Sequence, residues 1–143
     1  MIVYFKKLCP DAVTPMKAHQ SDAGFDLTAI SAAWDKNVTY LEYNTGICIE
    51  IPKGHVGLIF QRSSVSNVSQ ILSNCVGVID SGYRGEIKFR FKDIINGVPQ
   101  RRYVPGEKIG QLIIMPIPEI ELIETENLSE SDRGTGGFGS TGK

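Results

Sequence analysis

The chain has 143 residues, a formal net charge of −1 and a hydrophobic content of 41%. This length supports one domain that buries about two thirds of its unfolded surface, and it is too short for two comfortable domains. The balanced charge argues against a nucleic-acid or membrane surface. No apolar run approaches the roughly 18 residues of a membrane span, and we expect no signal peptide in the short apolar N-terminus.

Cysteine and histidine usage disfavours soft-metal chemistry. Cys9, Cys48 and Cys75 are an odd number without C-x-x-C spacing, which favours free thiols in the cytoplasm, or in the nucleus of a eukaryotic host. His19 and His55 lie far apart, so neither zinc binding nor a histidine-activated nucleophile is indicated. If a metal takes part, it should be a hard cation held by oxygens and a phosphorylated ligand, with Mg²⁺ the first choice.

Short runs of alternating or β-branched residues predict an all-β fold. Turn signals such as Pro52-Lys53-Gly54 separate these runs, and 63–73 could hold one short helix capped by Ser63 or Ser64. Many short, evenly spaced strands indicate a sandwich or jelly roll, which we assign to residues 1–126. In chain order, the expected strands are 2–5, 38–42, 46–51, 56–61, 86–93, 108–117 and 119–124.

The most informative motif is Gly77-Val78-Ile79-Asp80-Ser81-Gly82-Tyr83-Arg84-Gly85-Glu86. It places the carboxylate of Asp80 and the phenol of Tyr83 on a glycine-punctuated turn between two strand-like runs. We expect a rigid β-hairpin in which Gly82 and Gly85 supply positive φ angles. Polar residues on such a tip are typical of binding and catalysis. The alternative is an ordinary turn, with Arg84 and Glu86 as solvated charges.

The strand pattern ends near residue 127, and 127–143 reads as a mobile arm containing Arg133-Gly-Thr-Gly-Gly-Phe-Gly-Ser-Thr-Gly. Glycines let successive backbone N–H groups converge on an anion, while Arg133, Ser140 and Thr141 add charge and hydroxyl donors. The segment lacks the flanking strand, helix and lysine of a Walker loop. Phe138 has no periodicity that would bury it, which favours a ring that closes over a ligand base. The alternative is a disordered Gly/Ser tail.

Three shorter sequence strings also contain polar residues that could take part in a site. Asp26 begins a strand, and Gln111 is an uncharged donor on another strand. Arg62, Ser63 and Ser64 lie where a strand gives way to the possible helix, so they and the helix N–H groups could converge on a phosphate. Taken singly, these strings are also explained by a turn aspartate, an exposed glutamine and a helix cap beside a surface arginine.

In this order and spacing, the five strings resemble the trimeric deoxyuridine triphosphatase (dUTPase) family. The resemblance runs from Ala23-Gly24-Phe25-Asp26-Leu27 to the Arg-Gly tail, with small departures at Phe25, Gln61, Lys108 and Gly110. It implies a jelly-roll subunit of a homotrimer with active sites shared between subunits. It also implies Mg²⁺-dependent hydrolysis of dUTP to dUMP and pyrophosphate, which would keep uracil out of DNA and supply dUMP for thymidylate synthesis.

The resemblance implies roles for the matching residues. Asp80 would activate the attacking water, Tyr83 would pack beneath the deoxyribose, and Asp26 would bind Mg²⁺ through water. Other positions would read the uracil edge (74–79), hold phosphates (62–64 and 111) or close over the substrate (133–141). The substrate-binding residues so implied are Arg62, Ser63, Ser64, Asn74, Gly77, Val78, Ile79, Tyr83, Gln111, Arg133, Gly136, Gly137, Phe138, Ser140 and Thr141.

Two other functions need consideration. A dCTP deaminase of the same fold would carry a glutamate five residues after the hairpin glycine, but counting from Gly85 gives Arg90. A non-catalytic nucleotide-binding or signalling homologue is the second alternative. The presence of both Asp80 and the full glycine-rich tail argues against lost catalysis.

Overall fold

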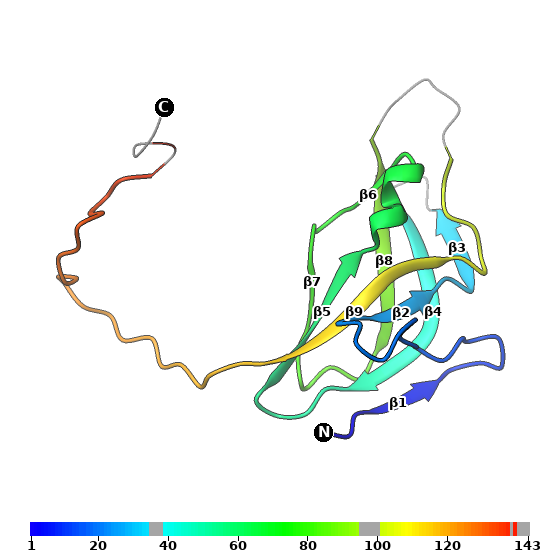
Figure 1. The fold of residues 1–143 in the computed structure, drawn as a ribbon, viewed down its shortest axis with the longest axis horizontal. Coiled ribbons are helices and arrows are strands. Elements are labelled where there is room, and N and C mark those ends of the chain that lie inside the picture. Colours follow the sequence, from blue (N-terminus) through cyan, green and yellow to red (C-terminus); the bar gives the residue numbers. More distant parts are fainter. Residues whose placement is uncertain (35–38, 95–100, 138, 140–143) are drawn as a thin grey trace.

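The computed structural model describes residues 1–34, 39–94, 101–137 and 139, which form two antiparallel sheets and one short 3₁₀ helix (Figure 1). In the first sheet the strand order is β1-β4-β8-β6, and β3 shares one edge of β4 with β1. The strands of this sheet are β1 (Tyr4–Lys7), β3 (Ser31–Trp34), β4 (Leu41–Glu50), β6 (Gln70–Leu72) and β8 (Glu86–Asp93).

The second sheet has the order β2-β9-β5-β7 and packs on the first (Figure 1). Its strands are β2 (Phe25–Thr28), β5 (His55–Gln61), β7 (Gly77–Ile79) and β9 (Lys108–Pro116). The predicted all-β jelly-roll architecture is therefore confirmed. The three cysteines are free, as expected, and no helix among the described residues is long and apolar enough to cross a membrane.

Strand β8 shows why this sequence forms a two-layer core. Ile87, Phe89 and Phe91 are fully buried, while the alternate residues are exposed, as a strand with one face on the core requires. The ring of Phe89 occupies the space beside Gly110 on β9, because a Cβ on Gly110 would lie 2.1 Å from Phe89 Cε1. Gly110, one of the positions where the chain departs from the resembled family, therefore has a packing reason: an alanine there would collide with this core ring.

Some strand boundaries differ from the sequence-based prediction. The expected strands 38–42 and 46–51 are one strand, β4, within the described residues; position 38 lies outside them. The register against β8 shifts between Asn44 and Cys48, and Gly46 has a φ of 66° there, so the glycine makes an irregularity inside a strand and not a strand end. β1 begins at Tyr4, two residues later than expected.

The segment 63–73 holds a short helix, as the sequence allowed, but the helix covers less than half of the segment. Only Ser63–Asn67 forms a 3₁₀ helix (η1), and β6 follows. Arg62 takes the N-cap position without a side-chain hydrogen bond, so neither serine is the predicted cap. A five-residue segment containing β-branched and serine residues has little intrinsic helix stability, whereas pairing with β8 satisfies the backbone of 70–72.

The expected strand 119–124 is also absent, because nothing in the described part of the chain pairs with it. Beyond β9 the backbone runs away from the sandwich as an extended segment (Figure 1). Its apolar side chains are open to solvent, with Ile120 at 70% and Leu122 at 94% exposure. The division into a core of 1–126 and an arm of 127–143 stays a prediction.

Candidate active site

The turn between β7 and β8 is not the predicted hairpin. β7 pairs with β5 and β8 pairs with β4 and β6, so the turn crosses from one sheet to the other. The positive φ angles expected at Gly82 and Gly85 are also wrong, because neither glycine has one. Glycine at position 85 instead lets the Tyr83 ring lie against the backbone, since a Cβ there would lie 2.4 Å from Tyr83 Oη.

Local hydrogen bonds give this turn a defined shape. The backbone N–H of Tyr83 donates to the carbonyl of Asp80 at 3.0 Å, which closes the turn. The Tyr83 hydroxyl then donates to the Glu86 carbonyl at 2.9 Å, so its ring folds back over Gly85. The carboxylate of Asp80 is left exposed to solvent beside the ring.

A cavity of about 660 Å³ lies beside this turn, and five sequence-predicted residues line it: Asn74, Val78, Ile79, Asp80 and Tyr83. Its volume falls within the range of small-molecule sites. Gly77 is buried behind it, where a Cβ would lie 2.3 Å from Ile59 Cγ1, so β7 can approach β5 only with glycine at this position. The structure therefore brings together the predicted catalytic carboxylate, sugar-packing ring and base-reading segment.

Part of the lining of this cavity is charged. Lys88 and Arg90 on β8 line it, and both pair with Glu42 at 2.8 and 2.9 Å. The hydrogen bond from Lys88, supported by Arg90, holds the pKa of Glu42 below its ordinary value despite partial burial. Glu42 thus remains ionised and offsets part of the positive charge that this lining presents.

A second predicted group gathers around Asp26, whose side chain is only 4% exposed. Arg62 Nε and Gln111 Nε2 donate to its Oδ1 at 2.9 and 3.2 Å, and Lys108 Nζ lies 2.9 Å from its Oδ2. Burial alone would raise the pKa of Asp26, but Lys108, Gln111 and Arg62 together hold it below its ordinary value. One carboxylate faces two cations, so this cluster carries a net positive charge suited to an anion.

Lys108 was missed as a functional candidate. The pairing of β2 with β9 shifts between Leu27 and Thr28, so that Thr28 faces Lys108 while Leu27 faces Gly110. This irregularity lets both Lys108 and Gln111 reach Asp26, which strict strand alternation would not allow. The only signal in the sequence was the position of Lys108 where the resembled family has arginine.

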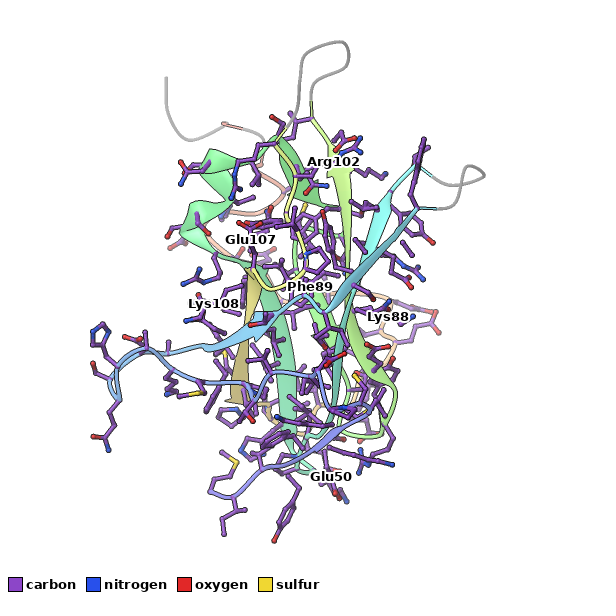
Figure 2. All side chains as sticks on the ribbon, turned by 90° about the vertical axis from the view of Figure 1, so that its right-hand side faces the viewer. Glu50, Lys88, Phe89, Arg102, Glu107 and Lys108 are labelled. Atoms are coloured by element: carbon purple, nitrogen blue, oxygen red, sulfur yellow. The ribbon has the colours of Figure 1, made fainter. Side chains whose placement is uncertain are left out.

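A single chain does not bring all predicted site residues together. Arg62 and Ser64 line a separate cavity of about 240 Å³ with Lys108, and among the described residues Arg62, Ser63, Ser64 and Gln111 do not line the cavity beside Asp80. Figure 2 shows Lys108 and Lys88 on opposite flanks of the sandwich, with Phe89 between them. The two halves of the predicted site therefore lie on different sides of one subunit.

The described part of the arm, 127–137, lies apart from the two sheets (Figure 1). Arg133 Nε donates to the carbonyl of Gly136 at 2.9 Å, which closes a small turn in the arm beside Gly137. Phe138, Ser140 and Thr141 lie outside the described residues. No group of three or more histidine, cysteine, aspartate or glutamate side chains suited to a metal occurs in the parts of the chain that the structure describes.

The fold and the two clusters define a β-sandwich protein with a nucleotide-sized cavity and a separate basic, anion-suited cluster. Comparison with known families makes this specific, since the dUTPase family model matches residues 11–142. The chain belongs to the dUTPase family. A curated relative, the deoxyuridine 5′-triphosphate nucleotidohydrolase of Clostridioides difficile, is 41% identical over 138 residues, covering 96% of this chain and 95% of the relative.

Two solved structures support the same relationship. The dUTPase of Staphylococcus bacteriophage 80alpha with dUPNHPP has a TM-score of 0.83 and 29% sequence identity, over 99% of each chain. A mutant of the dUTPase from phage phi11 of S. aureus, described with a coordinated structural Mg(II) ion, has a TM-score of 0.75 and 26% identity, over 89% of this chain and 98% of that chain.

Proposed function

We propose that this chain hydrolyses dUTP to dUMP and pyrophosphate, with Asp80 orienting and activating the attacking water. The observation that carries the proposal is the placement of Asp80 and Tyr83 on one closed turn, facing a nucleotide-sized cavity with Asn74, Val78 and Ile79. The names of the relatives agree with this activity. The activity would remove dUTP before uracil enters DNA and would supply dUMP for thymidylate synthesis.

The residues of the two clusters would have different roles in the reaction. Cleavage of a phosphoanhydride needs an aligned water and neutralised charge more than covalent help from the protein. A positioned carboxylate such as Asp80 contributes about 10²–10⁴-fold as a general base. Arg62, Lys108 and Gln111 would bind phosphate oxygens, with Ser63 and Ser64 at the start of η1 beside them.

Recognition of uracil fits the sheet topology. Among the described residues, β7 is the last strand of its sheet, so only one of its edges is paired. The backbone of Gly77, Val78 and Ile79 can therefore offer hydrogen-bonding groups to a base edge, and Asn74 lines the same cavity. Cytosine presents a donor where uracil has an acceptor, so this edge would reject it. The Tyr83 ring would exclude a 2′-hydroxyl by contact with the sugar.

We propose Mg²⁺ as the cofactor, and when bound it would neutralise charge on the triphosphate. Both carboxylate oxygens of Asp26 already have cationic or amide partners at 2.9–3.2 Å. This arrangement suits a contact of Asp26 with Mg²⁺ through a water molecule better than direct coordination of the metal by its carboxylate. Mg²⁺ bound as the nucleotide complex needs few protein ligands, which suits a site with one buried carboxylate.

We propose that the enzyme is a homotrimer in which subunits share active sites, and that Arg133, Gly136, Gly137, Phe138, Ser140 and Thr141 of the arm close over the bound nucleotide. Support comes from the separation of the Asp80 and Asp26 clusters within one chain and from the apolar side chains of Ile120 and Leu122, which a neighbouring copy could bury. Mass measurement in solution should give three copies of the 15.7 kDa chain. An active monomer would contradict the shared site.

Three free thiols suit a reducing compartment, and we propose the cytoplasm.

A turnover assay tests the activity against its alternatives. With Mg²⁺ present, dUTP should release pyrophosphate, while dCTP and UTP should react far more slowly. A deaminase would instead release ammonia from dCTP, but the position that such an enzyme gives to glutamate is Arg90, which pairs with Glu42. Nucleotide binding without turnover of any of the three would indicate a binding protein and refute the proposed hydrolysis.

A further inference from the structure

The side chain of Arg84 folds back onto the backbone of the turn that carries Asp80 and Tyr83. Its Nη1 donates to the carbonyl of Ser81 at 2.7 Å and to the carbonyl of Tyr83 at 2.9 Å. Its Nη2 donates to Glu50 Oε1 on β4 at 3.3 Å. One guanidinium therefore spans the turn, from the residue after Asp80 to Tyr83 itself, and joins it to β4, the strand that pairs with β8.

This guanidinium does not face the nucleotide-sized cavity. Arg84 lines a different groove, of about 390 Å³, formed with Phe5 of β1 and with Cys48 and Glu50 of β4. In the described parts of the chain it is not among the residues that line the cavity beside Asp80. Within one chain, Arg84 can therefore act on a nucleotide bound there through the turn carbonyls that it holds, without touching the nucleotide.

The far end of the turn is held to the same strand. Glu86 Oε1 accepts a hydrogen bond from the backbone N–H of Gly46 at 2.7 Å, in the irregular part of β4. The Tyr83 hydroxyl bonds to the Glu86 carbonyl, so the ring is linked to this second attachment. Glu86 is the first residue of β8, which pairs with β4 in the same sheet, so these contacts of Arg84 and Glu86 hold the β8 end of the turn to β4.

We propose that Arg84 is a positioning residue for the proposed dUTP hydrolysis. By holding the carbonyls of Ser81 and Tyr83, it fixes Asp80 for the attacking water and the Tyr83 ring for the sugar. The inference rests on the proposed function. A planar guanidinium can serve two carbonyls and a carboxylate at once, whereas the ammonium of a lysine is a compact charge without this fork.

The carbonyl contacts should matter more than the ion pair. The side chains of Arg84 and Glu50 are 54% and 57% exposed, so their pairing is screened by solvent and salt. We therefore expect E50Q to keep kcat for dUTP within about threefold of wild type. R84A should lower kcat about 10- to 100-fold, because a displacement near 1 Å at a reacting group can cost that much.

The experiment compares R84A, R84K and E50Q with R102A as a matched control. Arg102 is 49% exposed and pairs with Asp93 near the other end of β8, so its loss removes a similar surface ion pair far from the turn. For each variant, kcat and KM are measured with dUTP and with UTP, and the assembly is checked by mass and thermal unfolding. We expect R84A and R84K to lose kcat and dUTP-over-UTP selectivity together, while R102A matches wild type.

Hydrogen exchange of the amides in 80–86 supplies a readout that does not depend on activity. In R84A these amides should exchange at least about tenfold faster than in wild type or R102A, since the turn loses the hydrogen bonds that Arg84 donates to the carbonyls of Ser81 and Tyr83. Unchanged exchange, or unchanged selectivity in a folded variant, overturns the role of Arg84; R84K provides the folded variant if R84A does not fold. If the wild-type chain does not hydrolyse dUTP, the proposed function fails, and exchange alone then decides whether Arg84 holds the turn.

Discussion

Replacing Gly85 with alanine should separate the stability of this protein from its selectivity. A Cβ at this position would lie 2.4 Å from Oη and 2.6 Å from Cζ of Tyr83. Ordinary carbon contacts are about 3.5–4.0 Å, so the ring must move by roughly 1 Å or more. The backbone itself can accept alanine, because Gly85 does not have a positive φ.

The expected cost in folding free energy is small. Tyr83 is 44% exposed, so its ring can turn toward solvent without opening the core. The movement breaks the 2.9 Å hydrogen bond from its hydroxyl to the Glu86 carbonyl, which is a net loss of about 1 kcal/mol. For a chain of this size, we expect the melting temperature to fall by only about 2–5 °C.

The expected cost in activity is much larger. If the Tyr83 ring forms the wall beneath the sugar, moving it by about 1 Å should lower kcat/KM for dUTP by up to about 10²-fold. The same movement opens room for a 2′-hydroxyl, so the ratio of kcat/KM for dUTP over UTP should fall as well. The kcat/KM values for dUTP and for UTP, and hence their ratio, are measured from steady-state pyrophosphate release with each nucleotide.

Gly82→Ala is the matched control, since it changes the same turn where a Cβ would meet nothing within 4 Å. It should behave like wild type in melting temperature, rate and selectivity. The reasoning would be refuted by a Gly85→Ala variant that melts a few degrees lower and yet keeps wild-type selectivity. Such a result would mean that the Tyr83 ring does not shape the sugar site.

Three further predictions follow from the described sites. Asp80→Ala should lower kcat for dUTP by at least about 10²-fold while the nucleotide still binds in calorimetry, and normal turnover would remove Asp80 from its proposed role. Deleting 133–143 should leave the melting temperature nearly unchanged but reduce kcat/KM steeply, because closure and the Arg133 charge are lost; full activity at low dUTP would show that the arm is dispensable. Since the folded pKa of Asp26 lies below its ordinary value of 3.8, its pairing stabilises the fold above that pH and is lost as pH falls further. Asp26→Asn should therefore flatten the decline of the urea midpoint between about pH 5 and pH 3, and an unchanged slope would count against the ion pairs as its source.

The parts of the site that are local in sequence could be predicted from the sequence. Asp80 and Tyr83 are three residues apart on one turn, so their common position follows from chain connectivity alone, and the alternation of β8 follows from its period of two. The pairing of β7 with β5 instead of β8 could not be predicted from chain connectivity or from the alternation of residues. Both arrangements fit the same alternating pattern, and long-range packing decides between them.

Local propensity also failed where space, not backbone angle, selects a residue. Gly110 leaves room for the ring of Phe89 from the other sheet, and Gly85 leaves room for the ring of Tyr83, which folds back through its hydrogen bond to Glu86. Neither contact can be recognised from local propensity. The sequence predicted a strand at 119–124 from its apolar residues, yet a strand also needs a hydrogen-bonding partner, and the described part of this chain offers none.

The pairing of β2 with β9 also sets the order in which the protein can be built during synthesis. Asp26 and Gln111 are 85 residues apart in the chain and yet are direct neighbours in the sheet. β4 and β8 can pair once residue 93 has emerged from the ribosome, whereas the Asp26 cluster must wait for β9. Pairings of such long range fold slowly, on the millisecond to second scale. A growing chain therefore carries Asp26 without Lys108 and Gln111 until nearly all of the sandwich has been translated.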